Sequence, residues 1–378
     1  MKPDEFALEL HKKYRGKITT ALRDDGELTR EKLAAYYSPG VGEISLAIVD
    51  DPRKLRTYTW TNNLVAVISD GSAVLGLGNV GAKAALPVME GKAMLFKYFA
   101  GIDSIPIVLN VHTPDEIVAT VRAMARSFGA INLEDIAAPK CFEVEERLKA
   151  ELDIPVMHDD QHGTAIVVLA GLINAMKVVG KNLGDCTIAL AGAGAAGVAI
   201  AKLLHKYARP KILAVDTRGI ISRTRTDLND SKLMLLDYTN RRHREGTLAD
   251  AMVGADIFIG VSRGGLVTAK MVSSMAENPI VFALANPTPE IMPTKAHGAG
   301  AAVVATGRSD FPNQVNNALA FPGIFRGALD HRVHSISDRH KIAAAEALAS
   351  LVENPTPDCI IPSVFDPRVV PTIAAVIR

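Results

Sequence analysis

The sequence predicts an α/β protein made of two α/β domains, the second of them doubly wound, with a helical C-terminal tail. Three observations predict this fold class. Short apolar, β-branched runs alternate with longer helical stretches along most of the chain. A glycine-rich turn follows one of these runs and opens a helix. Two pairs of adjacent acids follow other strand-like runs, at the ends where parallel sheets place their ligands.

The first half of the chain supplies one set of alternating elements. Residues 4–60 predict helices and loops, with turns at Pro39-Gly40 and Asp51-Pro52. The expected strands are 64–68, 105–109, 129–133 and 154–157, and the expected helices are 84–99, 115–127 and 144–152. The segment 73–78 is a candidate hairpin partner of the first strand. This alternation favours a parallel sheet.

The second half repeats the alternation and then becomes helical. A helix over 163–179 leads to strands at 186–190, 211–216, 256–260, 280–284 and 302–305, with a helix from the glycine-rich turn to Tyr207. From about residue 312 the tail reads as helical. We expect an N-terminal domain at 1–160, a second domain at 161–312, and a segment at 313–378 that packs back on the first domain.

Bulk composition limits the class of protein. The 378 residues are 48% hydrophobic and 22% charged, with a net charge of +1, so we expect a folded core and no nucleic-acid partner. Three scattered cysteines exclude a disulfide framework. The start of the chain lacks an apolar export signal, and the apolar run 165–176 is shorter than a membrane span, so it predicts a buried helix. We expect a cytoplasmic protein without membrane contact.

The two acidic pairs predict a site for a hard cation. Asp159-Asp160 opens a long apolar segment, and Glu134-Asp135 follows a strand-like run. Buried carboxylates are costly unless a cation neutralises them, and oxygen ligands suit Mg²⁺ or Mn²⁺. Two alternatives stay open: both pairs are solvated turns or helix caps, or His158 and His162 bind zinc from one helix face.

The glycine-rich turn Gly192-Ala193-Gly194-Ala195-Ala196-Gly197 predicts a Rossmann-type dinucleotide site. It follows a strand, opens a helix, and precedes Asp216 by 19 residues, close to the spacing at which an acid meets the adenosine ribose. The helix N-terminus would face the pyrophosphate. Asp216 favours NAD⁺, whereas Arg218 could meet the 2′-phosphate of NADP⁺, so the choice stays open with a preference for NAD⁺. The alternative is a merely tight strand–helix turn.

Seven ordered motifs resemble one family. They are Tyr36-Tyr37-Ser38-Pro39-Gly40-Val41-Gly42, the stretch from Asp70 to Asn79, Leu86-Pro87-Val88-Met89-Glu90-Gly91-Lys92, Asn132-Leu133-Glu134-Asp135, His158 to Thr164, Ala285-Asn286-Pro287-Thr288-Pro289-Glu290, and Val315-Asn316-Asn317-Ala318. With these motifs the chain resembles bacterial malic enzymes of the short type over nearly its whole length.

The resemblance implies a metal-dependent oxidative decarboxylation of L-malate to pyruvate and CO₂. By similarity, Glu134, Asp135 and Asp160 are the metal ligands, Lys92 the general base, Tyr37 the general acid, and Asp159 the neighbour that tunes Lys92. Asn286 and Asn317 match residues that hold the substrate. Ser72 stands where larger malic enzymes carry an arginine for a substrate carboxylate. The residues expected at the coenzyme are Gly192, Ala193, Gly194, Ala195, Ala196, Gly197, Asp216, Arg218, Asn286 and Thr164.

Three other functions remain open at this point. A malolactic enzyme would keep NAD bound and release lactate, and a 2-hydroxy-acid dehydrogenase would need no metal. A non-catalytic NAD-binding regulator would have no use for Lys92, Tyr37 and the acidic pairs. The resemblance also implies a homodimer or larger assembly. Because the N-terminal segment reads as loosely tethered helices, our hypothesis is that the part bearing Tyr37 crosses to a partner subunit.

Overall fold

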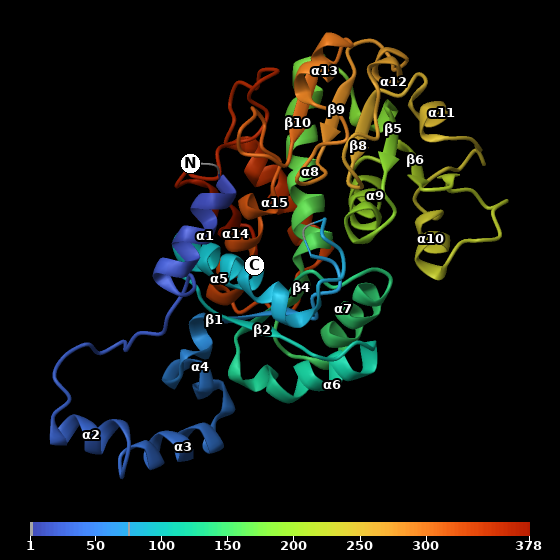
Figure 1. Cartoon of the computed structure of the whole chain (residues 1–378). Coiled ribbons are helices and arrows are strands. Elements are labelled where there is room, and N and C mark those ends of the chain that lie inside the picture. Colours follow the sequence, from blue (N-terminus) through green and yellow to red (C-terminus); the bar gives the residue numbers. More distant parts are fainter. Residues whose placement is uncertain (1–2, 75) are drawn as a thin grey trace.

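Two parallel sheets organise the chain in the computed structural model, which describes residues 3–74 and 76–378 (Figure 1). The first sheet has the order β2-β1-β3-β4. Its strands are β1 (Leu64–Ser69), β2 (Asp103–Val108), β3 (Ala130–Leu133) and β4 (Val156–His158), and all neighbours run parallel. Every residue of β1, β3 and β4 is buried, which explains why these strands read as continuous apolar runs.

Three helices connect the strands of the first sheet. They are α5 (Gly81–Ala100), α6 (Pro114–Met124), which continues into η3 (Ala125–Ser127), and α7 (Lys140–Glu151). A capping box between Thr113 and Glu116 fixes the start of α6. Gly101 ends α5 with a φ of 64°, a left-handed conformation that glycine adopts freely.

The segment 73–78 is not a hairpin partner of β1, so that prediction is wrong. Strand β1 pairs in parallel with β2 on one side and β3 on the other. Val74 forms only an isolated bridge with Gly78, and residue 75 lies outside the described residues. A central strand has no free edge for a hairpin, and its position in the sheet cannot be read from its own sequence.

Helix α8 (Asp159–Val179) joins the two halves of the molecule (Figure 1). Among the described residues it is the one helix long and apolar enough to cross a membrane by length and composition, but most of it is buried inside the protein, as a core helix. The helix starts at Asp159, four residues before the predicted start at residue 163, so Asp159 and Asp160 belong to its first turn. Carboxylates are stabilised there by the helix dipole.

The second sheet has the order β10-β9-β8-β5-β6-β7. Its strands are β5 (Thr187–Ala191), β6 (Lys211–Asp216), β7 (Gly219–Ile220), β8 (Ile257–Gly260), β9 (Ile280–Ala283) and β10 (Val303–Thr306), and only β7 is antiparallel. The helices around it are α9 (Ala195–Tyr207), α10 (Asp230–Leu235), α11 (Leu248–Met252), α12 (Ala269–Ser273) and α13 (Pro293–Gly298), with η4 (Leu183–Asp185) before β5. Strand β7 and helices α10 to α13 were not predicted; they are too short to give a periodic pattern.

The C-terminal segment forms η5 (Asn317–Leu319), α14 (Phe321–Asp330), α15 (Asp338–Ser350) and α16 (Val369–Ala374). Helix α14 packs against α5 of the first half: the ring of Phe96 lies 4.7 Å from that of Phe321 and 5.3 Å from that of Phe325, both in edge-to-face contact. The C-terminal helices therefore pack on α5 of the first half and, through α15, on α8.

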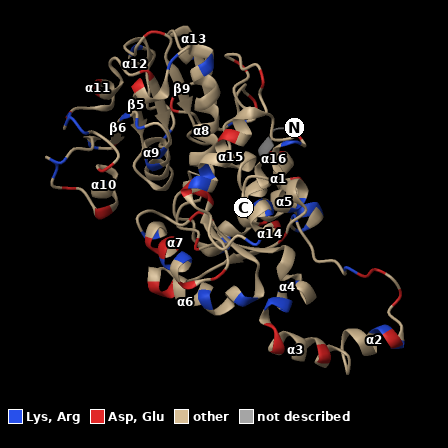
Figure 2. Ribbon diagram, turned by 180° about the vertical axis from the view of Figure 1, so that it is seen from behind, with Lys and Arg blue, Asp and Glu red and all other residues tan. Residues whose placement is uncertain are grey.

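The N-terminal region includes an arm formed by α2 (Arg30–Tyr36) and α3 (Val41–Asp50). The other elements of this region are α1 (Pro3–Tyr14), η1 (Pro52–Lys54), α4 (Leu55–Tyr58) and η2 (Trp60–Asn63). Helices α2 and α3 project from the body (Figures 1 and 2), and they contain no buried residue. Apolar side chains on this arm are open to solvent, among them Leu33, Leu46 and Val49. An apolar face without a covering is typical of a surface that meets a partner.

Candidate active site

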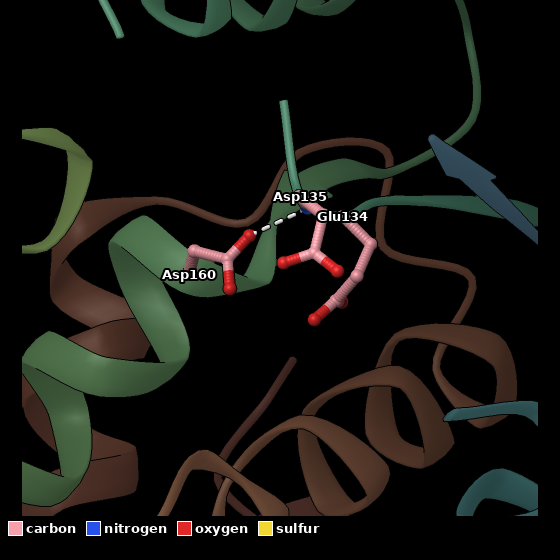
Figure 3. A group of neighbouring side chains, drawn as sticks. All are labelled: Glu134, Asp135 and Asp160. Carbon is pink, nitrogen blue, oxygen red and sulfur yellow. Dashed lines mark hydrogen bonds between the residues drawn. The ribbon is translucent and has the colours of Figure 1, made fainter. Parts of the chain in front are cut away.

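Three carboxylates converge where two neighbouring strands of the first sheet end. Leu133 of β3 lies opposite His158 of β4 in parallel register, so the residues that follow each strand meet at one edge. Oxygen atoms of Glu134, Asp135 and Asp160 lie within 4.8 Å of one another (Figure 3). The backbone N–H of Asp135 donates to Asp160 Oδ2 over 2.8 Å, which ties the loop after β3 to the first turn of α8.

Lys92 of α5 reaches this group of acids. Its Nζ lies 2.7 Å from Asp159 Oδ2 and 2.9 Å from Glu134 Oε1, and it lies 4.4 Å from the ring centroid of Phe321. Burial by itself lowers the pKa of Lys92, but the carboxylates of Asp159, Glu134 and Asp160 outweigh it, so the pKa is raised. Burial raises the pKa of Asp159 to about 6. At neutral pH the pair is therefore a Lys92 ammonium beside an Asp159 carboxylate.

A glycine makes room for this arrangement. A side chain at Gly163 would place its Cβ 1.9 Å from Asp159 Oδ1 and 3.1 Å from Asn317 Cβ. Asn317, at the start of η5, therefore packs beside the turn that carries Asp159. Only a residue without Cβ lets the carboxylate of Asp159 lie over α8 and face Lys92.

The donor set fits a hard divalent ion. Glu134 and Asp135 are 3% exposed, and burial raises the pKa of Glu134. Three neighbouring carboxylates repel one another unless a cation lies between them, and a set of oxygens alone favours Mg²⁺ or Mn²⁺ over zinc. In the described part of the chain this is the one group of three or more such residues close enough to share an ion. The assignment of Glu134, Asp135 and Asp160 as ligands stays a prediction.

His158 and His162, the alternative zinc ligands, have structural contacts instead. His158 lies just before α8 as its N-cap, and His162 Nε2 lies 2.8 Å from Glu145 Oε2. Burial lowers the pKa of His162 to about 4, so the ring is neutral at pH 7. Glu145 also accepts from the N–H of His158 over 3.0 Å and pairs with Lys149. These contacts fasten α7 to the start of α8.

The glycine-rich turn lies between β5 and α9, at the carboxyl end of the second sheet. Gly192 has a φ of 120°, and a Cβ there would lie 2.7 Å from the carbonyl oxygen of Val261. A Cβ on Gly197 would lie 1.9 Å from the carbonyl oxygen of Gly192, whereas Gly194 faces open space. The turn borders a cavity of about 600 Å³ that also meets Asp216, Arg218 and Lys232. This is the shape that a pyrophosphate over a helix N-terminus requires.

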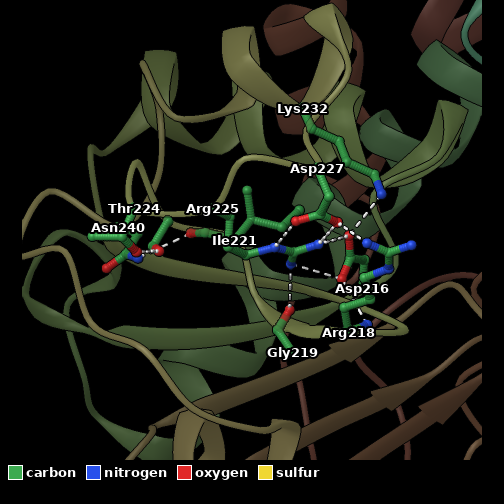
Figure 4. A network of polar contacts seen from close by, with 10 residues as sticks. Asp216, Arg218, Gly219, Ile221, Thr224, Arg225, Asp227, Lys232 and Asn240 are labelled. Atoms are coloured by element: carbon green, nitrogen blue, oxygen red, sulfur yellow. Dashed lines mark hydrogen bonds and ion pairs between the residues drawn. The ribbon is translucent and has the colours of Figure 1, made fainter.

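Asp216 lies at the centre of a charged network at the end of β6 (Figure 4). Arg225 donates to both of its carboxylate oxygens, over 2.8 and 3.0 Å, and Lys232 donates to Oδ2 over 2.6 Å. These hydrogen bonds overcome burial and hold the pKa of Asp216 well below its usual range. Arg218 pairs with Asp227 at 3.1 Å. Sequence reasoning found Asp216 and Arg218 but not Arg225 and Lys232, which lie in a segment without a motif.

Other predicted residues lie outside the carboxylate group. Tyr37 ends α2 on the projecting arm and is 71% exposed, so its own chain does not bring it to Lys92 (Figure 1). The hydroxyl of Ser72 donates to Asp70 Oδ1 over 2.6 Å and accepts from the N–H of Ala137 over 2.9 Å. It therefore joins the loops after β1 and β3.

Asn286 and Thr164 are two further residues predicted at the coenzyme. Asn286 is exposed after β9, and its backbone carbonyl lies against Gly76 of the first half. Thr164 is half-buried in the second turn of α8. Both assignments stay predictions.

Two supporting residues were missed by sequence reasoning. Asn132, fully buried in β3, donates to Glu134 Oε2 over 2.8 Å and so orients that carboxylate. Phe321 lies beside the Lys92 ammonium. The sequence offered a signal for Asn132, because one asparagine interrupts an apolar strand just before an acidic pair. It offered no signal for Phe321, because this residue belongs to a helix far away along the chain.

A dinucleotide-binding sheet beside a buried lysine–carboxylate centre defines an NAD(P)-dependent oxidoreductase. The family descriptions that match are "Malic enzyme, N-terminal domain" over residues 15–149 and "Malic enzyme, NAD binding domain" over residues 161–376. The chain therefore belongs to the malic enzyme family.

Named relatives and solved structures agree with this family assignment. The chain is 54% identical to the bifunctional malic/malolactic enzyme of Bacillus subtilis, over 98% of this chain and 91% of that protein. It is 49% identical to the NADP-dependent malic enzyme of Halomonas elongata, over 94% of this chain and 84% of the relative. The crystal structure of the NAD-dependent malic enzyme of Thermotoga maritima is 47% identical and superposes with a TM-score of 0.95, over 98% of both chains.

Proposed function

We propose that the protein catalyses the oxidative decarboxylation of L-malate to pyruvate and CO₂ with reduction of NAD(P)⁺. The observation that carries this proposal is the Lys92–Asp159–Glu134 ion-pair group beside two further carboxylates. A simple dehydrogenase needs one base, whereas a decarboxylating one needs groups for proton removal and for charge on the substrate oxygen. Membership of the malic enzyme family agrees with this reaction.

Each side chain has a defined task in this proposal. The Lys92 ammonium first gives a proton to Asp159 Oδ2, 2.7 Å away, and the neutral amine then accepts the proton of the malate hydroxyl. A divalent ion bound by Glu134, Asp135 and Asp160 would supply Lewis-acid stabilisation of the substrate oxygen. Asn317 would orient the substrate beside Asp159. Tyr37 would return a proton to the carbon that loses CO₂.

We propose NAD⁺ as the preferred coenzyme and Mg²⁺ or Mn²⁺ as the ion. Asp216 keeps its negative charge at the position of the adenosine ribose, which opposes a 2′-phosphate. Arg218, Arg225 and Lys232 reduce that repulsion, so NADP⁺ is expected as a weaker coenzyme rather than an excluded one. Relatives named as NAD-dependent and as NADP-dependent both occur.

We further propose that the protein acts in the cytoplasm as a homodimer or larger assembly. Tyr37 lies on an arm whose apolar side chains are uncovered, and the catalytic group of the same chain lacks it. An arm that crosses to a partner would cover those side chains and complete the partner's site at once.

A spectrophotometric assay tests the proposed function. With L-malate, Mn²⁺ and each coenzyme in turn, we expect NADH or NADPH to appear together with pyruvate, faster with NAD⁺. EDTA should abolish the reaction and added Mn²⁺ should restore it. Reduced coenzyme without pyruvate, or activity that survives EDTA, would contradict the proposal.

The same assay tests the malolactic alternative, which the name of the Bacillus subtilis relative raises. In that reaction, malate disappears and lactate accumulates while no NADH is released. Equal amounts of pyruvate and NADH would support the malic enzyme reaction and exclude the malolactic one. Lactate in excess of NADH would favour the malolactic reaction.

A further inference from the structure

A second cavity lies in the coenzyme-binding half, at the end of the sheet away from the glycine-rich turn. It has a volume of about 330 Å³ and is bordered by the residues that start β5 and β6 and by the loop 238–244. Strand β6 runs from Lys211 beside this cavity to Asp216 beside the coenzyme cavity. Its ends are about 17 Å apart at the usual rise of a strand, so the two cavities are separate.

The lining of this cavity is strongly cationic. It contains five basic side chains and no acid: Arg209, Lys211, Arg241, Arg242 and Arg244. None of the five forms an ion pair with a carboxylate within the described residues, although Arg244 donates to the backbone carbonyl of Asp250 over 2.9 Å. On nearby His205, burial and the charges of Arg241 and Arg209 lower the pKa. We call these five residues the basic pocket.

The loop that presents three of these arginines is held in place. Asn240 is 4% exposed and has a φ of 42°. Its side-chain amide donates to the carbonyls of Ile221 and Arg244, and its oxygen accepts from the N–H of Arg244 over 2.8 Å. Asn240 N–H also donates to the carbonyl of Ile212 in β6 (Figure 4 shows Asn240 beside Ile221). The arginines are therefore anchored to the sheet rather than spread on a free loop.

The positive charge in the basic pocket favours an anion as its ligand. Five like charges around one small cavity repel one another, and arginine binds phosphate oxygens through paired N–H groups. Basic residues gather in the loops beside β6, at the outer edge of this half (Figure 2). The concave shape and small volume fit part of a small molecule rather than a flat macromolecular surface.

We infer that the basic pocket binds a small polyanion with two or more linked phosphate groups, at a site distinct from the coenzyme site. Tyr238 lines the pocket, and its ring lies tilted against that of His205 at 5.5 Å between centroids, so an organic group attached to the phosphates would find an aromatic neighbour. The shared chemistry is the phosphate chain. It could come from inorganic polyphosphate or from a nucleoside diphosphate.

Calorimetric titration of the full-length protein tests this inference. Tripolyphosphate and ADP are titrated separately, each in saturating NAD⁺ so that the coenzyme cavity is filled. We expect one site per chain, with affinity that falls as salt rises. The double variant Arg241→Ala/Arg242→Ala should bind at least about tenfold more weakly, because two charge-assisted contacts are lost, while the KM for NAD⁺ stays unchanged. Both arginines are exposed, so folding should survive; Arg209→Ala is a second variant with the same expectation.

Lys270→Ala, an exposed cation on α12 of the same half, is the matched control and should bind like the wild type. Tighter binding of ADP than of tripolyphosphate would identify the ligand class as a nucleotide, and the reverse order as inorganic polyphosphate. Binding that is unchanged in both arginine variants, or that disappears when NAD⁺ is present, would overturn the inference. Equally tight binding of a short DNA duplex would also overturn it, because it would indicate an open basic surface.

Discussion

Lys92 keeps its charge in a place almost closed to water. It is 8% exposed and would lose its proton without compensation, yet Asp159 and Glu134 lie within 3 Å of Nζ. Burial raises the pKa of Asp159 to about 6, although the Lys92 ammonium acts to lower it. Each group is stabilised by the other, so removal of one leaves its partner without its nearest opposite charge, which is strongly disfavoured. A pair in this state can pass a proton with little movement of atoms.

Substitution of Lys92 tests its role as the base. Lys92→Ala should lower kcat for malate oxidation by about 10² to 10⁴, the range that a positioned proton acceptor contributes. NADH binding, followed by fluorescence, should stay unchanged because the coenzyme cavity is formed by other residues. Lys97→Ala, on the same helix but exposed, is the control. Near-normal turnover in Lys92→Ala would remove Lys92 from the mechanism.

At the scale of elements, α8 belongs to both halves of the molecule. Its first turn carries Asp159 and Asp160, and its later turns pack against the second sheet and the C-terminal helices. Asn174 is a polar residue in this apolar helix and is fully buried. Its amide donates to the carbonyls of Ala349 and Ile360 over 2.9 and 3.0 Å, so it connects α8 to two parts of the C-terminal segment.

Asn174→Leu tests that connection. Two buried carbonyls would lose their donor, and we expect the free energy of unfolding to fall by roughly 2–4 kcal/mol, while the kcat of the folded enzyme changes little. Urea unfolding followed by circular dichroism measures the loss. Lys177→Ala removes only the contact to the Asn174 oxygen and should cost less than about 1 kcal/mol. Equal stability of Asn174→Leu and wild type would contradict the argument.

Helix α15 contains a buried lysine whose state depends on pH. Lys341 is 5% exposed, and burial together with Lys149 lowers its pKa to about 8 despite Asp338 and Glu145. Between pH 8 and the ordinary lysine value, the unfolded chain keeps a proton that the folded chain releases, so the contribution of Lys341 to stability rises with pH there and is lowest below pH 8.

Lys341→Met should therefore remove one part of the pH dependence of stability. Relative to this variant, the wild type should gain about 1 kcal/mol per pH unit between pH 8 and 10. Urea titrations of both proteins at several pH values in this range measure the difference. A constant difference across the range would show that Lys341 does not titrate there.

At the scale of the whole molecule, the predicted acid lies apart from the other predicted catalytic residues. The carboxylate group, Lys92 and the coenzyme cavity lie in the body, but the predicted acid, Tyr37, lies on the projecting arm. Helices α2 and α3 have no buried residue and leave apolar side chains uncovered. An arm that packed on the body of a partner subunit would cover its own apolar side chains and bring Tyr37 to the partner's Lys92.

Mixing of two inactive variants tests this arrangement. Tyr37→Phe and Lys92→Ala should each lack activity. Dissociated and reassembled together in equal amounts, they should regain about a quarter of wild-type activity, because half of the dimers are mixed and each mixed dimer has one intact site. Analytical ultracentrifugation should find dimers or larger assemblies. No recovery in verified mixed dimers would place Tyr37 in its own subunit's site.

The sequence was most informative where chemistry and strand order coincide. The acidic pairs after β3 and β4 were found because parallel strands end at one edge of the sheet, and the glycine-rich turn because its spacing is tied to phosphate geometry. Arg225 and Lys232 were missed because they meet Asp216 only through the path of an irregular segment. The hairpin at 73–78 was wrong because strand order depends on distant partners.

The position of the junction between the two halves, at the start of α8, limits how the sequence can evolve. Glu134 and Asp135 precede α8, whereas Asp159 and Asp160 are its first residues. A cut near residue 158 would leave each half with an incomplete set of charged groups, so a foreign half could replace one of them only if it carried the matching acids. The two halves are therefore constrained to change together, even though each has its own sheet.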